Sequence, residues 1–134
     1  MNLSNNISSI NGSIGNINNQ INSLYTNNLL WSGASYVDAY NHYLNQTISS
    51  QKHGVVLIFS FYENNVAQNW GWHSFYVPKF MATNHGGQAN CFNMMWNSID
   101  TIKIIYFDDN LIVGNTQNSS GNNTRFVLRY VIGV

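Results

Sequence analysis

Apolar residues recur through the first 24 residues of the chain at spacings that alternate strictly between four and three. They are Leu3, Ile7, Ile10, Ile14, Ile17, Ile21 and Leu24. This is the heptad repeat of a coiled coil, in which both apolar positions of each heptad face a partner helix. The pattern predicts a helical stalk over residues 1–28 whose apolar stripe is covered by other helices.

The residues between the apolar positions indicate that this helix needs partners. Most of them are Asn, Ser and Gly, which have low helix propensity, and a short isolated helix is marginal in water even for good helix formers. Isoleucine at both core positions of a heptad favours three or four strands over two. We therefore expect a parallel homotrimeric coiled coil. A disordered Asn-rich leader, or a helix packed on its own domain, is the alternative.

The rest of the chain, residues 29–134, has the pattern of a mainly β domain. Runs of β-branched and aromatic residues predict strands at 55–62, 73–79, 101–107, 111–114 and 125–134, with further strands at 29–37, 43–48 and 89–96. Turn-rich segments separate these runs, and Asp108-Asp109-Asn110 predicts a tight hairpin. Six to eight short strands of this kind predict an antiparallel β-sandwich or barrel of jelly-roll or Greek-key type.

The charge content excludes several classes of function. Only 7% of the residues are charged, and five basic residues balance five acidic ones. This balance argues against binding to nucleic acid or to an anionic membrane. We expect no membrane insertion and no secretion signal, because no apolar run approaches about 18 residues and no basic region precedes one. Cys91 is the only cysteine, so an internal disulfide is excluded and synthesis in a reducing compartment is expected.

Several segments of the β domain resemble a known family. These are LLWSGASYV, HGVVLIFSFY, WHSFYVPKF, FDDNLIVGNTQNSSG and the terminal RFVLRYVIGV. They resemble the C-terminal head domain of receptor-binding proteins in the tail fibres or baseplates of phages and prophages of Gram-positive bacteria. The resemblance covers about residues 29–134, and it is most specific in HGVVLIFS, FYVPK and FVLRYVIGV.

The resemblance implies both a function and partners. It implies a homotrimeric head that binds a host cell-wall saccharide, such as a teichoic acid or a wall polysaccharide. The protein would be made in the bacterial host cytoplasm and would be located in the virion, in contact with other virion tail proteins. Members of the family usually carry an N-terminal attachment region, whereas here only the heptad segment precedes the head. A fragment of a longer fibre and a separately encoded tip are both open interpretations.

The segment NWGWHSFY is the densest aromatic cluster of the chain. Two positions separate Trp70 from Trp72, so in an extended segment both would face the same side. Sugar rings stack on aromatic faces, while amide and imidazole groups bind hydroxyls. The predicted saccharide site consists of Tyr62, Asn69, Trp70, Trp72 and His73. The alternative is that both tryptophans fill the core or the trimer interface.

Other candidates for chemistry are weaker. Asp108 and Asp109 are the only adjacent carboxylates, and a solvated turn is the simpler interpretation. Cys91 has no local signature of a catalytic thiol, so a buried, inert cysteine is expected. Arg125 and Arg129 on the last predicted strand are interpreted as structural. The histidines lack the spacing of metal ligands; they are His42, His53, His73 and His85.

We therefore expect an adhesin, with no catalytic residues, no metal site and no cofactor. Two alternatives stay open at this point. One is a depolymerase or esterase that acts on the wall polysaccharide, and the other is a purely structural domain that trimerises or caps a fibre.

Overall fold

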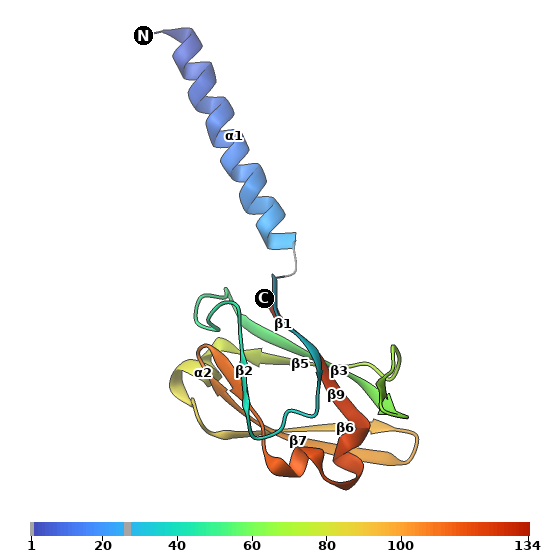
Figure 1. The fold of residues 1–134 in the computed structure, drawn as a ribbon. Coiled ribbons are helices and arrows are strands. Elements are labelled where there is room, and N and C mark those ends of the chain that lie inside the picture. The colour runs from blue at the N-terminus through green and yellow to red at the C-terminus, as the bar shows by residue number, and fades with distance from the viewer. Residues whose placement is uncertain (1, 26–27) are drawn as a thin grey trace.

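The computed structural model describes residues 2–25 and 28–134, together with their side chains except those of residues 22–25. Helix α1 (Leu3–Tyr25) is followed by a mainly β head, as the sequence predicts. Figure 1 shows the helix as a single rod that stands away from the strands. With a rise of 1.5 Å per residue, this helix is about 35 Å long.

The apolar stripe of α1 is open to solvent in a single chain. Its exposed fractions range from 45% at Ile21 to 72% at Leu3. The side chain of Leu24, the last predicted member, lies outside the described residues. Polar side chains add local bonds instead: the side-chain oxygen of Asn2 accepts a hydrogen bond from the Ser4 amide at 2.9 Å. In a single chain, the apolar residues of the repeat from Leu3 to Ile21 are therefore not buried.

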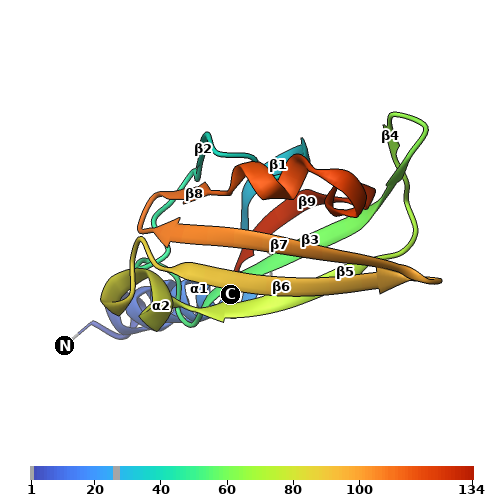
Figure 2. The ribbon, with the colours of Figure 1, turned by 90° about the horizontal axis from the view of Figure 1, so that it is seen from below.

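The head is built from two antiparallel sheets. The first has the order β1-β9-β3-β4, and β5 pairs with β3 on the same side as β4. Its strands are β1 (Asn28–Ser35), β9 (Phe126–Gly133), β3 (Gly54–Glu63), β4 (Val66–Ala67) and β5 (His73–Pro78). The second has the order β2-β8-β7-β6. Its strands are β2 (Asn41–Tyr43), β8 (Leu111–Val113), β7 (Ile99–Asp108) and β6 (Ala89–Trp96). Figure 2 shows β7 and β6 side by side across the head.

Alternating side chains form one core between the two sheets. On β7 the buried positions are every second residue, which is the period of a half-buried strand. They pack against inward side chains of the first sheet. The largest buried apolar residues are Leu30, Ile48, Leu57, Phe59, Phe61, Met94, Ile105, Phe107, Ile112, Phe126 and Leu128. The core therefore joins both sheets into one unit.

Most of the predicted strands are confirmed, but three segments differ. Strand β2 covers only residues 41–43, and the chain then forms a loop in which the Asn45 amide donates to the Leu30 carbonyl at 3.0 Å. After Pro78 the chain turns into a short helix, α2 (Lys79–Asn84). Arg125 is the last residue of a 3₁₀ turn, η2 (Gly121–Arg125), which follows a first such turn, η1 (Thr116–Ser119). The predicted hairpin is confirmed, since Asp108 pairs with Leu111.

The strand pairings define two ends of the first sheet: the stalk end, where β1 begins after α1, and the opposite, distal end. Gly133 pairs with Asn28, the first residue of β1, and also with Val55 near the start of β3. At the other end Phe61 pairs with Phe126. Seven residues at about 3.3 Å each put roughly 23 Å between Gly133 and Phe126. The ends of β1 and β3 and the start of β9 therefore meet far from the point where the chain enters from α1 (Figure 1).

The stripe of α1 yields a prediction about assembly. Replacing Ile14 and Ile17 together with Asn puts two amides where a trimer would bury isoleucines. We expect the oligomer to lose roughly 1.5–3 kcal/mol for each isoleucine in each chain, measured by urea unfolding at several protein concentrations. Asn16→Ser with Asn19→Ser, at positions off the stripe, is the matched control. An oligomer unaffected by the isoleucine changes would show that the head alone holds it together.

Candidate functional site

The predicted saccharide residues do not form one cluster. Trp70 is half-buried against the core, with its ring 4.9 Å from that of Phe61 and 5.1 Å from that of Trp96 on the second sheet. Trp72 instead lies beside Tyr130 of β9. The two tryptophans do not share a side because Gly71 between them has a positive φ of 69°, which turns the chain. Extended geometry, which the sequence prediction assumed, does not hold here.

His73 and Tyr62 also have separate surroundings. The His73 ring packs edge-on against Phe126 at 4.9 Å, and its Nδ1 lies 3.0 Å from the Gly71 carbonyl oxygen. These contacts place His73 among the structural residues at the margin of the core. Tyr62 lies at the distal end of β3, where it meets Tyr36.

Trp72 belongs to an exposed group that we name the Trp72 platform, defined by Asn69, Trp72, Arg129 and Tyr130. The Trp72 side chain is 45% exposed, and its ring is stacked with that of Tyr130 at 6.3 Å with an interplanar angle of 21°. The guanidinium carbon of Arg129 lies 5.3 Å from the Trp72 ring centre and 5.8 Å from that of Tyr130. The platform thus joins two aromatic faces to a cation.

Arg129 is fixed by neutral groups. It donates to the Ser60 hydroxyl at 2.8 Å, to the Gln68 carbonyl at 3.0 Å and to the Asn69 side-chain oxygen at 3.2 Å. Among the described residues no carboxylate lies within ion-pair distance of it. The platform therefore carries a net positive charge. The sequence analysis interpreted Arg129 as structural; the pairing of β9 and of β5 with β3 brings it beside Trp72.

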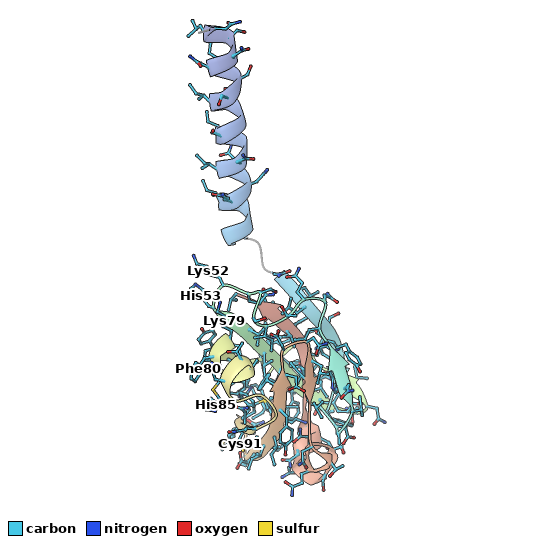
Figure 3. All side chains as sticks on the ribbon, turned by 90° about the vertical axis from the view of Figure 1, so that its left-hand side faces the viewer. Lys52, His53, Lys79, Phe80, His85 and Cys91 are labelled. Atoms are coloured by element: carbon cyan, nitrogen blue, oxygen red, sulfur yellow. The ribbon has the colours of Figure 1, made fainter. Side chains whose placement is uncertain are left out.

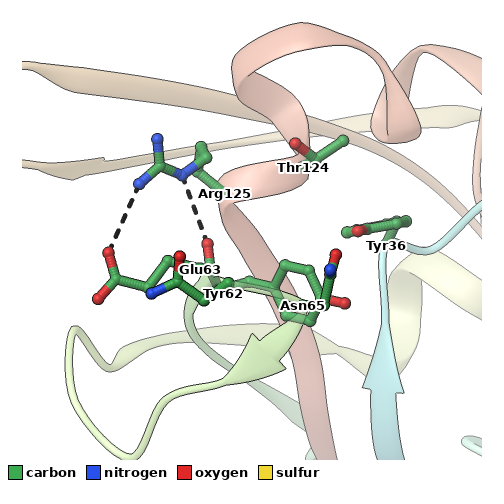
Figure 4. Close-up of a pocket in the computed structure, with 7 residues that line it drawn as sticks. Tyr36, Tyr62, Glu63, Asn65, Thr124 and Arg125 are labelled. Carbon is green, nitrogen blue, oxygen red and sulfur yellow. Dashed lines mark hydrogen bonds and ion pairs between the residues drawn. The ribbon is translucent and has the colours of Figure 1, made fainter.

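A second group forms a cleft of about 340 Å³ at the distal end of the first sheet. We name it the distal cleft. It is lined by Tyr36, Tyr62, Glu63, Asn64, Asn65, Thr124 and Arg125. Figure 4 labels six of them around the cleft: Tyr36 follows β1, Tyr62 and Glu63 end β3, Asn65 lies in the turn after β3, and Thr124 and Arg125 come from η2. Of the predicted saccharide residues, this cleft contains Tyr62.

The two tyrosines of the cleft stand nearly at right angles. Their ring centres are 5.3 Å apart and the interplanar angle is 83°. Burial raises the pKa of Tyr36, and the neighbouring Tyr62 hydroxyl adds to the shift. Tyr36 is therefore a neutral phenol at physiological pH, able both to donate and to accept a hydrogen bond.

The charges of the cleft balance each other. An Arg125 Nη2 lies 3.8 Å from a Glu63 carboxylate oxygen, and its Nε donates to the Tyr62 carbonyl at 3.4 Å. The Arg125 guanidinium carbon is also 4.8 Å from the centre of the Phe61 ring. Asn64 and Asn65 form the turn with positive φ angles of 54° and 62°, which Asn tolerates better than most residues.

A buried lysine holds the walls of the cleft together. Lys103 lies on β7 at a core position and, although it is a lysine, its exposed fraction is 0%. Its ammonium donates to the carbonyl oxygens of Tyr36 and Asn118, both at 3.0 Å, and to that of Asn123. Three acceptors match the three N–H donors of an ammonium group. Lys103 thus ties the end of β1 to the 3₁₀ turns that lead into Arg125.

Side-chain amides complete the edge of β7. Strand β8 pairs with only the last residues of β7, so the backbone groups of Ile102 and Ile104 have no strand partner on that side. The Asn118 side chain both donates to the Ile104 carbonyl and accepts from its amide, each at 2.8 Å. Asn123 accepts from the Ile102 amide at 2.9 Å. These two asparagines replace a strand and fix the 3₁₀ turns in place.

Ser35 and His42 form a close polar pair, with the serine Oγ 2.6 Å from the histidine Nε2. This is the spacing of a nucleophile and its base, but both residues are buried, with exposed fractions of 8% and 5%. The Ser35 hydroxyl also accepts from the Val37 amide at 2.9 Å, and Val37 has an unusual φ of 59°. Burial lowers the pKa of His42, which keeps the ring neutral. The pair supports a strained turn.

The remaining candidates have structural contacts or stand alone. Asp109 is not a free turn residue, because its carboxylate accepts from the amide and hydroxyl of Ser49 at 2.8 and 2.7 Å. Cys91 is exposed, so the expectation that it is buried is wrong; it lies on β6 with its side chain outward. In the part of the chain that the structure describes, no three His, Cys, Asp or Glu side chains group as metal ligands.

One side of the head gathers cationic and aromatic residues. Figure 3 labels five of them along this side, Lys52, His53, Lys79, Phe80 and His85, together with Cys91. The Lys79 ammonium is engaged by the Gln51 carbonyl at 3.2 Å, and the rings of Phe80 and His85 pack edge to face at 5.3 Å.

Comparisons with protein-family models, with curated protein sequences and with solved structures gave no match for the chain. Across residues 2–25 and 28–134, no helix is both long enough and apolar enough to cross a membrane. The site must therefore be interpreted from its own geometry.

Lys103 yields a prediction about pH. Burial lowers its pKa to about 7, and the nearby charge of Asp38 partly opposes the shift, whereas the unshifted value is 10.5. Between these values the unfolded chain holds the proton and the native protein releases it, so stability rises with pH in this window. We expect the free energy of unfolding to rise by up to about 1.4 kcal/mol per pH unit relative to Lys103→Met, from urea unfolding between pH 7 and 10. Parallel pH profiles of the two proteins would contradict this.

Asn118 yields a prediction about stability. Asn118→Ala removes the partner of the half-buried amide and carbonyl of Ile104 and of the buried Val37 carbonyl, and a buried group without a partner costs about 1–3 kcal/mol. We expect thermal and urea unfolding to show a loss of roughly 2–5 kcal/mol. Asn122→Ala, an exposed position in the same turns, is the control and should change stability by less than about 0.5 kcal/mol. Equal effects of the two substitutions would refute the role assigned to Asn118.

Proposed function

We propose that this protein is the tip of a phage tail fibre or baseplate, a homotrimeric receptor-binding protein that attaches to a host cell-surface saccharide. The single observation that carries the proposal is the exposed isoleucine stripe of α1, joined directly to a β head. Three parallel helices would bury the stripe and present three jelly-roll-like heads on one stalk. The resemblance of residues 29–134 to heads of this kind supports the same function.

The composition of the head supports a saccharide as the target. Solubility comes mainly from neutral amides and hydroxyls, which suits a surface that meets polyhydroxylated polymers. The Trp72 platform offers the aromatic face on which a sugar ring stacks, and the Asn69 amide lies at its edge. The unpaired charge of Arg129 suits a phosphate group of a teichoic acid.

Three weak sites on one stalk would bind a repeating polymer more tightly than one site. Attachment of the first head raises the effective concentration of the other two, so avidity rises without new contacts. Such a protein would be made in the host cytoplasm and would act in the virion, in contact with other tail proteins.

Two other functions make different predictions. A depolymerase or esterase would release soluble fragments from purified cell walls. A structural cap of a fibre would form a stable trimer and bind no wall polymer. Adhesion predicts binding without product release.

The experiment is a sedimentation assay with purified cell walls from a panel of Gram-positive bacteria. We expect the full chain to bind walls of at least one species, and Trp72→Ala to lower that binding by about tenfold, equivalent to about 1.4 kcal/mol. Tyr43→Ala removes another exposed aromatic residue, outside the platform, and is the matched control.

Both variants should keep the oligomeric state and the unfolding temperature of the parent protein, because neither side chain belongs to the core. The aromatic-surface proposal fails if Trp72→Ala binds cell walls as the parent does. Release of soluble saccharide during the assay would favour the enzyme.

A further inference from the structure

We propose that the distal cleft is a second carbohydrate site, separate from the Trp72 platform, which binds one neutral sugar ring. The relevance of this site to host attachment rests on the proposed function. Binding of the sugar itself rests on the geometry of the cleft alone.

The cleft lies where a stalked head would meet a surface. Its residues come from the ends of β1 and β3 and from η2, which leads into β9, and register places all three at the distal end of the first sheet. The chain therefore enters the head at the stalk end of the first sheet, and the cleft opens at the distal end. A polymer on a cell surface would reach this end first.

The lining matches the groups of a sugar ring. The crossed rings of Tyr36 and Tyr62 form part of the lining and carry phenolic hydroxyls, which can both donate and accept hydrogen bonds. The amides of Asn64 and Asn65 stand on an exposed turn, and amides both donate to and accept from hydroxyl groups. A cleft of about 340 Å³ is at the small end of the range for ligand sites, which suits one ring rather than a long segment.

Charge decides between a neutral sugar and a phosphate. The Arg125 guanidinium already faces the Glu63 carboxylate at 3.8 Å, so the pair adds no net charge. A phosphate that reached Arg125 would also meet the carboxylate, which repels it. Hydroxyl groups instead bond well to both members of such a pair, because one donates and the other accepts. The cleft is thus suited to a neutral ring, in contrast to the cationic platform around Arg129.

The walls of the cleft are fixed before a ligand arrives. Lys103 binds the backbone of Tyr36 on one side and that of Asn118 and Asn123 on the other. Arg125 is held by the Tyr62 carbonyl. Because little ordering remains to be done, even a small ligand with few contacts gains measurable affinity.

The test is a titration of the ¹⁵N-labelled full chain, followed by NMR, with methyl glycosides of glucose, galactose, rhamnose and N-acetylglucosamine, and with glycerol 3-phosphate as the anionic probe. We expect at least one neutral glycoside to bind with a dissociation constant on the order of 1 mM. The shifts should centre on the amides of residues 36, 62–65 and 124–125.

Variants separate the cleft from the platform. Tyr62→Ala should weaken binding of the glycoside by about tenfold. Asn65→Gly keeps the positive φ of the turn and removes only an exposed amide, so it should fold normally and weaken binding severalfold. Trp72→Ala should bind the glycoside as the parent does.

Glu63→Gln tests the charge argument. It removes the carboxylate that repels phosphate, so glycerol 3-phosphate should bind the variant but not the parent. The proposal is overturned if none of the four glycosides shifts the cleft amides, if Asn65→Gly and Tyr62→Ala bind as the parent does, or if the parent prefers glycerol 3-phosphate.

The outcomes also separate this site from the proposed function. A chain that binds a glycoside in the cleft but binds no cell wall keeps the site and loses the adhesin. A chain that binds cell walls through Trp72 but shows no glycoside-induced shift of the cleft amides keeps the adhesin and loses the site.

Discussion

The apolar stripe of α1 is the constraint on which the architecture depends. A helix composed mainly of Ile, Asn, Ser and Gly gains little from intrinsic propensity, and one chain leaves the isoleucines in water. Burial of each would contribute roughly 1.5–3 kcal/mol, which is the largest favourable term open to this segment. Since β1 begins three residues after α1 ends, helices that associate in parallel would bring their heads together at the stalk end.

The head has one end near the stalk and one end away from it. Its first sheet has one end at the stalk and the other about 23 Å away, and the distal cleft lies at the far end. What keeps that end ordered is polar: an ammonium group shared by three carbonyls, and two asparagine side chains that act as a missing strand. The buried Lys103 and the two asparagines thus hold the 3₁₀ turns against β7, where a longer β8 would otherwise pair.

Local patterns predicted the elements well, and long-range pairings were beyond them. The heptad predicted α1, and the β-branched runs predicted seven strands closely, because both depend on residues near one another in the sequence. The split of Trp70 from Trp72 depends on a single positive φ at Gly71. Tyr36 and Arg125 join Tyr62 only through the pairing of β9 with its neighbours, so no local signal marked the cleft. Lys103 did leave a signal, because it occupies an inward position in the alternation of β7.

The most direct test of the central claim is the molar mass of the full chain in solution, measured by light scattering over a range of concentrations. One chain has a mass of 15.2 kDa. A homotrimeric coiled coil predicts three times that mass, falling toward one chain when the isoleucine stripe is interrupted. A monomer at all concentrations would contradict the claim, since the stripe would then be exposed without a partner of its own kind.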